Sequence, residues 1–469
     1  MRPSYLGKNH LHWCDNCHTP VLGRVCSCGT ATREVLITPP GDARPGFEMD
    51  IKHINHVYCK HFNTSLIPEG HIVILNKIPD KDRMEEVVMG GAVVCSIRYL
   101  PEERRWEVLP RVHATKFAKP DKKFVVVDSG AIESIRSGSS VLAPGLISIE
   151  DSVVAGDEVF IVDKCGECIG VGRAKIDAKT ARTMERGSIV RTRKVKKSEC
   201  FPGPATWDEA VVSNRDVLRN VEAEAINFVK NVAKDNLKLP MNVSYSGGKD
   251  SLATLLVVLR ALGKVPLLFA DTGLEFAETY ENVDTVVKHY GLEIIKTGNG
   301  DNFRETFETE GPPAVDLRWC CKVCKLNPVK ELITEKWGEC LSFIGQRKYE
   351  SLARMKSPRI WKNNQVRVQL SAAPIQHWTA LHVFIYLFQE KAPYNVLYER
   401  RIDRIGCYMC PSSDIATFEL IKEEYPELWA EWTEKLEWWR NQNNLPEKWI
   451  KNALWRKRGL DADDNSSYT

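Results

Sequence analysis

The sequence lacks the long apolar run that a membrane span needs. No stretch approaches the roughly 18 consecutive apolar residues that cross a bilayer. The N-terminal stretch MRPSYLGKNHLHWCDNC has no apolar core of the kind found in a secretory signal. The net charge of +3 is also small, so charge alone selects no class of partner. These absences predict a protein that is not bound to membranes and is cytoplasmic.

What is present is typical of a large globular protein. Hydrophobic residues make up 43% of the chain and charged residues 27%. A chain of 469 residues is too long for one hydrophobic core, so about two to four domains are expected.

The chain has fifteen cysteines, and most of them are clustered. A reducing cytosol opposes disulfides, so the clusters indicate metal binding. The grouped cysteines are Cys14, Cys17, Cys26 and Cys28; Cys165 and Cys168; Cys320, Cys321 and Cys324; and Cys407 and Cys410. The isolated cysteines, which we expect to be small buried hydrophobes, are Cys59, Cys95, Cys200 and Cys340.

Composition and turn signals divide the chain into six segments. They are a small cysteine-rich segment (10–30), a mixed module of short strands with a helix at DKDRMEEVV (45–118), a strand-and-turn segment typical of a compact β-barrel (122–197), a proline-rich linker (198–209), an alternating region (210–415) and a helical cap (416–461). The last fifty residues carry six of the thirteen tryptophans, which predicts packing or, alternatively, a surface that stacks on bases.

The alternating region predicts an α/β fold. Helical patterns at 220–234, 251–263 and 277–291 alternate with short apolar strands at 240–246 and 265–271. This rhythm is typical of a parallel sheet with helices on both faces.

The stretch Ser246-Gly247-Gly248-Lys249-Asp250-Ser251 lies between an apolar strand and an apolar helix. Two glycines let the backbone approach a ligand, and a helix N-terminus offers free N–H groups to phosphate. Lys249 would add a positive charge. The glycine spacing is not that of the Walker loop. The alternative is a simple capped turn.

This stretch resembles the PP-loop of the ATP pyrophosphatase superfamily. Four further stretches resemble elements of the PAPS reductase family: FADTGLEFAET (269–279), GQRKYESLAR (345–354), PIQHWTALHVFIYL (374–387) and NVLYERRIDRIGCYMCP (395–411). The resemblance implies a Rossmann-like adenine-nucleotide domain over 210–415. The order of domains resembles archaeal proteins of this family.

The resemblance also gives the cysteines a role. In the iron–sulfur branch of the family, the adenylyl-sulfate reductases, C-C-x-x-x-K-x-x-P is followed by C-x-x-C, which Cys320, Cys321, Cys407 and Cys410 match. It implies a 4Fe–4S cluster, with zinc in the same place as the alternative, because thiolates select either. Cys324 departs from the pattern and is either another ligand or a thiol that carries sulfur.

The N-terminal cysteines Cys14, Cys17, Cys26 and Cys28 resemble a zinc ribbon, since paired knuckles supply four thiolates for a structural zinc. His18 is a substitute ligand or a surface side chain. Residues 122–197 resemble a PUA domain, an RNA-binding module. Its basic run, Arg173 to Lys197, is either a solvated face or a phosphate-binding surface.

Two further candidate sites are weaker. Cys165 and Cys168 lie at a hairpin turn, where we expect neither metal binding nor redox chemistry. The cluster His53, His56, Cys59 and His61 matches no spacing known for a metal site.

Two departures argue against a plain sulfonucleotide reductase. The sequence given has no cysteine after Cys410, whereas those reductases attack sulfur with a C-terminal cysteine. The loop also has the form expected for ATP. We therefore expect an ATP-dependent sulfurtransferase that acts on RNA, most simply tRNA. The alternative is a reductase of adenylyl sulfate or its 3′-phosphate, and a third reading is a non-catalytic RNA-binding protein.

The expected site follows from the resemblance. Ser246, Gly247, Gly248, Lys249 and Ser251 would hold phosphates, and Asp250 would act through magnesium. Asp271 stands at a strand's carboxyl end, where open sheets bind ligands. Arg347 and Arg354 would clamp phosphate or sulfate. The expected catalytic residues are Lys249, Asp250, Asp271 and Cys324. A sulfur or electron donor protein and a homodimer are expected partners.

Overall fold

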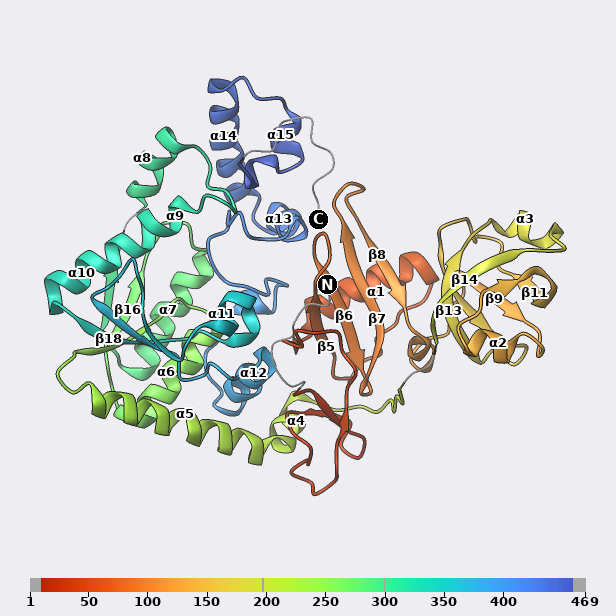
Figure 1. Ribbon diagram of the computed structural model, residues 1–469, viewed down its shortest axis with the longest axis horizontal. Helices are drawn as coiled ribbons and strands as arrows, with labels where there is room; N and C mark the ends of the chain where they lie inside the picture. The colour runs from red at the N-terminus through yellow and green to blue at the C-terminus, as the bar shows by residue number, and fades with distance from the viewer. Residues whose placement is uncertain (1–9, 196–197, 299, 459–469) are drawn as a thin grey trace. The chain divides into compact units, whose positions relative to one another are not determined.

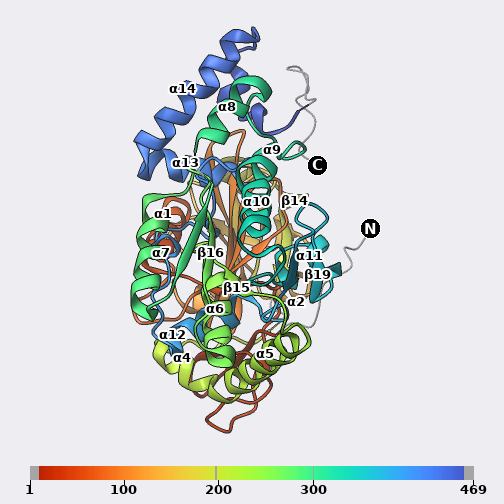
Figure 2. The same ribbon diagram turned by 90° about the vertical axis from the view of Figure 1, so that its left-hand side faces the viewer.

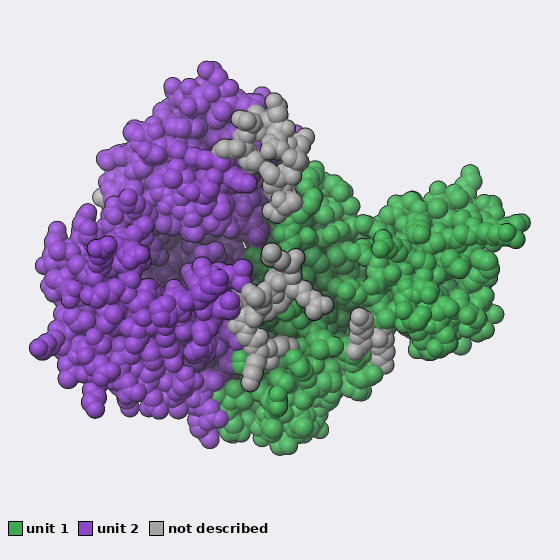
Figure 3. Space-filling view, viewed as in Figure 1, with its two compact units in different colours: residues 1–217 green, residues 218–469 purple. Residues whose placement is uncertain are grey.

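The computed structural model of the protein describes residues 10–195, 198–298 and 300–458 and divides into two compact units. Figure 3 shows the two units in different colours, with the boundary between Val217 and Leu218. This boundary falls inside a long helix. The first nine residues, Lys196 and Lys197 of the basic run, and residues 459–461 of the expected cap lie outside the described ranges. None of the described helices combines the length and the apolar character that crossing a bilayer requires.

Unit 1 begins with a small antiparallel sheet of three strands. Their order is β2 (Thr19–Val21), β1 (His12–Cys14) and β3 (Arg33–Glu34). The core of this segment consists of Val21 together with the cysteines Cys14, Cys17 and Cys26. A core this small needs a metal or a cross-link to fold stably.

A five-stranded antiparallel sheet follows (Figure 1), in the order β4 (Arg44–Pro45), β5 (Ile74–Ile78), β6 (Met84–Met89), β7 (Ala92–Leu100) and β8 (Arg105–Pro110). Helix α1 (Glu48–Phe62) packs on it through Ile54, Tyr58 and Phe62. The carboxylate of Asp50 accepts the N–H of Phe47 and so caps the first turn of the helix.

The expected helix at DKDRMEEVV (80–88) is wrong, because most of this stretch forms β6. Glu85 and Glu86 are both buried in the strand. Glu85 forms a salt bridge with Arg44 at 3.1 Å, and Glu86 accepts a hydrogen bond from Asn76 at 2.9 Å. Adjacent acidic residues suggest an exposed helix in sequence, whereas distant partners allow this strand to bury them.

The segment that resembles a PUA domain forms a six-stranded sheet. Its order is β10 (Val141–Leu142), β14 (Ser188–Val195), β13 (Cys168–Ala174), β12 (Glu158–Val162), β9 (Phe124–Val127) and β11 (Leu146–Ile149), antiparallel except between β12 and β9. Short helices α2 (Ile132–Arg136) and α3 (Ala178–Thr183) cover its ends. Phe160 and Val162 share one core with Phe62 of α1, so the five- and six-stranded sheets pack together inside unit 1.

Unit 2 contains the expected parallel sheet, with helices on both faces. Figure 2 shows its strands between α7 (Ala277–Tyr290) and α10 (Asn327–Trp337). The strand order is β17 (Ile294–Thr297), β16 (Leu267–Ala270), β15 (Met241–Ser244), β18 (Cys340–Ile344), β20 (Gln369–Ala372) and β19 (Ile360–Lys362), and only β19 is antiparallel.

The strand order reverses direction between β15 and β18. From β15 the chain moves outward to β16 and β17, and it then returns to place β18 on the other side of β15. The carboxyl ends of two such strands border a crevice in which open α/β sheets bind ligands. The loop 245–248 follows β15 and the loop 345–347 follows β18, so both lie at this switch point.

The remaining helices of unit 2 complete the fold. They are α5 (Arg215–Asp235), which starts in unit 1, α6 (Lys249–Leu262), α8 (Asp301–Glu310), α9 (Trp319–Cys321), α11 (Leu352–Lys356), α12 (Ala380–Gln389), α13 (Ile415–Glu424), α14 (Pro426–Gln442) and α15 (Lys448–Lys451). The three C-terminal helices pack with α8 and α9: Trp432 and Trp455 are buried against Phe303 and Phe307. Trp432 and Trp455 thus serve packing, while Trp438 is 42% exposed.

Candidate nucleotide site and cysteine centres

The loop between β15 and α6 requires its glycines. Gly247 has a φ of +72°, which favours glycine, and a Cβ there would lie 2.7 Å from the side chain of Thr279. Gly248 is the N-cap of α6. Ser251 donates to the carbonyl of Gly248 at 2.8 Å, and its oxygen accepts the N–H of Ser246 at 3.2 Å. The loop is therefore a fixed turn at a helix N-terminus, a geometry that suits phosphate.

Three charged side chains meet at the first turn of α6. The guanidinium of Arg347 donates to one oxygen of Asp250 at 2.6 Å, and the ammonium of Lys249 donates to the other at 3.0 Å. Arg347 is only 2% exposed. Burial alone would raise the pKa of Asp250, but the charges of Arg347 and Lys249 outweigh it and lower that pKa. Asp250 is thus held ionised.

The sequence interpretation missed two residues that contact this loop. The hydroxyl of Tyr398 accepts the backbone N–H of Lys249 at 2.9 Å, and the amide of Asn395 donates to the carbonyl of Gly247 at 3.4 Å. Both belong to the quoted stretch 395–411, whose family-like pattern was the available signal. Neither contact can be predicted from local sequence patterns, because the partners are more than a hundred residues apart in the chain.

Asp271 lies at the carboxyl end of β16, as expected. Its carboxylate accepts the N–H of Gly273 at 2.9 Å and the hydroxyl of Tyr280 at 2.7 Å. Glu275 shares that hydroxyl at 3.2 Å. Arg354 is placed differently from Arg347: its side chain is 38% exposed and pairs with Glu350. The structure therefore brings Arg347 to the loop but gives Arg354 a local partner.

The C-terminal cysteine centre combines two separate segments. Cys320 and Cys321 belong to α9, whereas Cys407 and Cys410 lie in a turn before α13, closed by a hydrogen bond from the Cys410 N–H to the Cys407 carbonyl at 3.1 Å. Thr272, from the loop after β16, lies 3.6 Å from the Cys407 sulfur. Arg318 donates to the Cys321 sulfur at 3.4 Å.

The four thiols share one electrostatic environment. The hydrogen bond with Cys320 and the charge of Arg318 overcome the effect of burial and lower the pKa of Cys321 to about 5. The pKa of Cys320 is raised by that same hydrogen bond, by burial and by the proximity of Cys321, Cys407 and Cys410. At Cys324, burial and the nearby charges of Cys321 and Glu275 all raise the pKa of the thiol.

Cys324 lies in a single π-helical turn, Lys322–Leu326, that joins α9 to α10. Its side chain is 1% exposed and belongs to the aromatic core of the C-terminal helices. Burial raises the pKa of its thiol to about 11. π-Turns interrupt helices preferentially at functional sites.

The four cysteines of this centre supply soft sulfur donors. Its four soft thiolates suit iron–sulfur or zinc chemistry. Within the described ranges, however, only the N-terminal cysteines bring three or more ligand atoms within 4.8 Å of one another.

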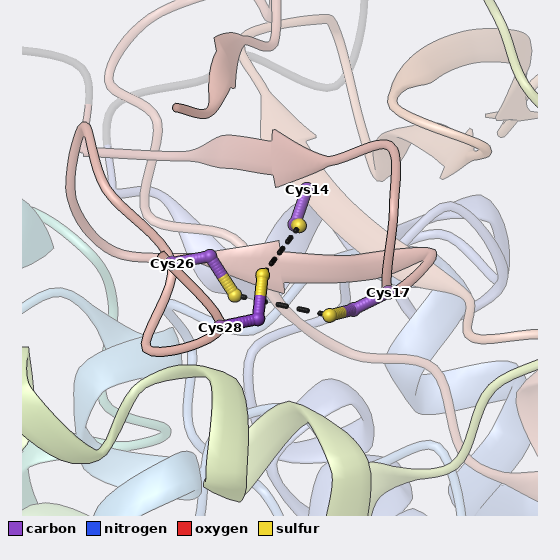
Figure 4. Close-up of side chains that lie close together, drawn as sticks. All are labelled: Cys14, Cys17, Cys26 and Cys28. Carbon is purple, nitrogen blue, oxygen red and sulfur yellow. Dashed lines mark hydrogen bonds between the residues drawn. The ribbon is translucent and has the colours of Figure 1, made fainter. Parts of the chain in front are cut away.

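The N-terminal group is compact (Figure 4). The sulfur atoms of Cys14 and Cys28 are 3.7 Å apart, and those of Cys17 and Cys26 are 4.0 Å apart. Hydrogen bonds from Thr30 lower the pKa of Cys28 to about 6, which favours a thiolate. Four cysteine sulfurs at this spacing could bind one tetrahedral metal ion.

This group is bonded to the segment that leads into α5. Thr19 donates to Ser213 at 2.8 Å, and the Leu22 N–H donates to the side chain of Asn214 at 2.7 Å. Ser213 also forms a hydrogen bond with Cys26. Ser213 ends helix α4 (Trp207–Ser213), so this contact to the cysteine group comes from just beyond the expected linker at 198–209.

Other expectations have mixed outcomes. His18 is not a surface side chain, because its ring lies against Gly203 and its Nδ1 is buried. Cys59 is exposed on α1, so the expectation of a buried side chain is wrong there, while Cys95, Cys200 and Cys340 are buried. The reason is that Cys59 lies on the outer face of the helix.

The weaker metal candidates form no ligand group among the described residues. Cys165 is exposed in the turn, whereas Cys168 is buried with its sulfur 3.4 Å from the Gly170 carbonyl. His53 packs edge to face with Trp106, with ring centroids 4.8 Å apart, and His61 bonds the backbone of its own helix.

Part of the basic run is used in ion pairs. Arg173 bonds Glu107 at 3.1 Å, and Arg193 bonds Glu158 at 2.6 Å. Arg186 and Arg191 are exposed. The face is therefore basic, but several of its charges already have carboxylate partners.

Comparison with known proteins defines the class. The model of the phosphoadenosine phosphosulfate reductase domain matches residues 240–413, and the model of the PUA domain matches residues 123–196. The first domain carries the loop and the C-terminal cysteines, and the second is the six-stranded sheet. The fold is thus a PP-loop-like α/β domain combined with a PUA domain.

One relative is similar along almost the whole chain, whereas the named reductases match about a third of it. The uncharacterized protein MJ0066 of Methanocaldococcus jannaschii is 42% identical over 97% of both chains. An adenosine 5′-phosphosulfate reductase of a Geobacillus species is 28% identical over 36% of this chain and 71% of its own length. The chain therefore carries a phosphoadenosine phosphosulfate reductase domain and a PUA domain, and it belongs to one family with this archaeal protein.

Among solved structures, the phosphoadenylyl-sulfate reductase of Candida auris in complex with phosphate is similar in its fold. It is 20% identical, covers 42% of this chain and 96% of its own, and superposes with a TM-score of 0.32.

Proposed function

We propose that this protein uses ATP to activate a nucleobase of RNA, most simply of tRNA, and replaces an oxygen of that base by sulfur. The observation that carries the proposal is the intact loop at the switch point, with Lys249, Asp250 and Arg347 gathered at its helix, on one chain with a PUA domain. A reductase of small sulfonucleotides has no evident use for an RNA-binding module.

The chemistry has two steps, and both balance without an oxidant or reductant. First, the carbonyl oxygen of the base attacks the α-phosphorus of ATP, the bond between the α- and β-phosphates breaks, and pyrophosphate leaves. Second, hydrosulfide adds to the activated carbon, the bond from that carbon to the oxygen of AMP breaks, and a proton is released. Adenylation is needed because a carbonyl oxygen is a poor leaving group, whereas AMP is a good one.

The residues of the loop bind and orient the nucleotide. The N–H groups around Gly247, Gly248 and Ser251 would hold phosphate oxygens at the positive end of α6. Arg347 and Lys249 would balance the charge that develops as pyrophosphate leaves. Asp250, which stays ionised at neutral pH, would hold a magnesium ion. Asp271 would face the substrate from the end of β16.

The cysteine centre would stand beside this site. Cys320, Cys321, Cys407 and Cys410 would hold a 4Fe–4S cluster, which when bound supplies a centre that binds sulfur or transfers electrons. The burial of Cys324 favours a role inside the centre rather than as a mobile sulfur carrier. The four N-terminal cysteines would hold a structural zinc.

The test uses the full chain, purified and reconstituted with iron and sulfide without oxygen. We expect it to convert ATP into AMP and pyrophosphate, with stimulation by tRNA that lacks thionucleosides, and to introduce sulfur detectable by mass spectrometry of the digested nucleosides. A strain without the gene should lack that thionucleoside.

The second candidate function is reduction of adenylyl sulfate or its 3′-phosphate, favoured by the similarity of residues 240–413 to the reductase domain. If the reconstituted protein reduces adenylyl sulfate with thioredoxin and does not consume ATP, the sulfurtransferase proposal is overturned. An unchanged thionucleoside profile together with lost growth on sulfate would lead to the same conclusion.

A further inference from the structure

Tyr398 lies at the nucleotide loop, although its position in the sequence is far from it. The residue is 3% exposed, and its hydroxyl lies 2.9 Å from the backbone nitrogen of Lys249, where α6 begins. A Cβ on Gly248 would lie 3.3 Å from that hydroxyl. The residue enters through a short helical turn, Val396–Tyr398, whose N-cap Asn395 holds the carbonyl of Gly247.

The hydroxyl of Tyr398 can both accept a hydrogen bond and donate one. Its oxygen accepts the backbone N–H of Lys249, which belongs to the first turn of α6, where a helix does not bond its N–H groups to its own carbonyls. Among the described residues, no acceptor is recorded for the hydroxyl's own proton. An unused donor in a buried place has a cost unless a ligand supplies the acceptor.

The surroundings keep that proton in place. The ammonium of Lys249 lies 5.3 Å from the centre of the Tyr398 ring and 5.9 Å from the centre of the Phe384 ring. Burial raises the pKa of Tyr398, and the charge of Lys249 opposes this only in part, so the hydroxyl is neutral and can donate at neutral pH.

We infer that Tyr398 binds the nucleotide, with its hydroxyl relaying the N–H of Lys249 to a phosphate oxygen. The Lys249 N–H would donate to the hydroxyl, and the hydroxyl would donate to the phosphate. These two hydrogen bonds in series extend the reach of the helix N-terminus by one side chain. It also places an aromatic ring beside Lys249, which fixes the ammonium at the same end of the site. This inference rests on the proposed function, since it assigns a residue that holds the phosphates of its nucleotide.

A purely structural role is the competing explanation. In that case the hydroxyl only caps the helix, and its loss would lower the stability of the free protein without changing the affinity for phosphates. The two roles are separated by comparing ligands that contain phosphate with one that does not.

The experiment measures binding of ATP, inorganic pyrophosphate and adenosine to the full chain and to Tyr398→Phe. We expect the variant to bind ATP and pyrophosphate about ten- to a hundredfold more weakly, which is the loss of one hydrogen bond to a charged group, and to bind adenosine as the wild type does. Tyr394→Phe is the matched control, because its hydroxyl bonds Glu399 at 2.7 Å instead of the loop. It should bind all three ligands normally.

Each outcome decides a separate question. If the wild type consumes ATP and Tyr398→Phe binds pyrophosphate as tightly as the wild type, the inference is overturned and the proposed function stands. If Tyr398→Phe weakens pyrophosphate binding but neither protein consumes ATP, the inference stands and the proposed function fails. If the wild type binds neither ATP nor pyrophosphate, both are wrong.

Discussion

At the scale of single residues, the candidate site depends on charges that come together from different strands. Asp250 follows β15 and Arg347 follows β18, yet their side chains are 2.6 Å apart. The loop after β18 can approach because Gly345 has no side chain: a Cβ there would lie 2.5 Å from the backbone of Asp250. The charge of Arg347 and the small size of Gly345 thus both contribute to the contact with Asp250.

The pair of Arg347 with Asp250 predicts a strong effect of removing the guanidinium. Arg347→Met should cost about 3–5 kcal/mol in the free energy of unfolding, because it leaves a buried carboxylate with one partner. Since Arg347 and Lys249 lower the pKa of Asp250, this stabilisation is present at neutral pH and is lost as the pH falls below about 4. Urea unfolding at pH 7 and pH 3 measures both.

The matched control is Arg354→Met, whose guanidinium is partly exposed and pairs with Glu350. It should cost less than about 1 kcal/mol. Equal destabilisation by the two substitutions would contradict the assignment of a buried, site-forming role to Arg347 alone.

At the scale of elements, two parts of the chain that look peripheral in sequence hold the structure together. The N-terminal cysteine group bonds helix α4 through Ser213, and the C-terminal helices pack on the segment that carries Cys320 and Cys324. Each small element is stabilised by what it contacts rather than by its own length.

The N-terminal group predicts a dependence of the connecting segment on metal. Cys26→Ser should bind less than one zinc per chain at that site, and residues 198–217 should then be cut faster by a protease, because the bonds from Thr19 and Leu22 to this segment depend on a folded knuckle. Metal analysis and timed proteolysis with mass spectrometry measure the two effects.

Cys59→Ser is the control, since Cys59 is an exposed cysteine on α1. It should change neither the zinc content nor the cleavage rate. Unchanged cleavage in a Cys26→Ser protein that has lost its zinc would show that the metal does not stabilise the segment.

Two tryptophans of α14 distinguish a role in core packing from a role in RNA binding. Trp432 is fully buried and Trp438 is 42% exposed on the same helix. Trp432→Ala should cost about 3–5 kcal/mol in the free energy of unfolding of unit 2, and Trp438→Ala less than about 1 kcal/mol. Denaturant titration followed by fluorescence measures this. A loss of RNA affinity in Trp438→Ala would instead support the base-stacking alternative.

At the scale of the whole molecule, the combination of domains suggests how substrate choice and chemistry are divided. The PUA domain occurs on the same chain as a nucleotide-binding α/β domain, and the full-length archaeal relative is similar across 97% of the chain. Under the proposed function, labour is divided: the PUA domain would bind RNA and the α/β domain would activate it.

This division predicts the effect of charge reversal on the PUA surface. Arg186→Glu with Arg191→Glu should weaken tRNA binding and reduce the slope of log K against log salt concentration by roughly one to two units, because phosphate contacts are lost. ATP consumption without RNA should not change. Filter binding at several salt concentrations and a pyrophosphate assay give the two measurements.

Arg182 serves as the control position, because it already pairs with Asp151. Arg182→Gln should leave the salt dependence close to that of the wild type. If the double reversal leaves tRNA affinity unchanged, this face of the PUA domain does not bind RNA.

The sequence predicted most of the α/β unit because its signals are local. Strands β15 and β16 and helices α5, α6 and α7 lie where apolar periodicity predicts them. The helix predicted at residues 80–88 is wrong because the deciding contacts there are not local. Whether two adjacent glutamates are exposed in a helix or buried in a strand depends on partners such as Arg44 and Asn76, which no local pattern contains.

By itself, the sequence determined two things. It placed a glycine at position 247, where the loop takes a positive φ that favours glycine. It also grouped cysteines whose thiolates select soft metals. Only the tertiary structure decided which residues share a site. It brought Arg347 and Tyr398 to the loop and left Arg354 with Glu350. The physical reason is that contacts between distant residues depend on how strands order and pack, and short-range patterns leave that order open.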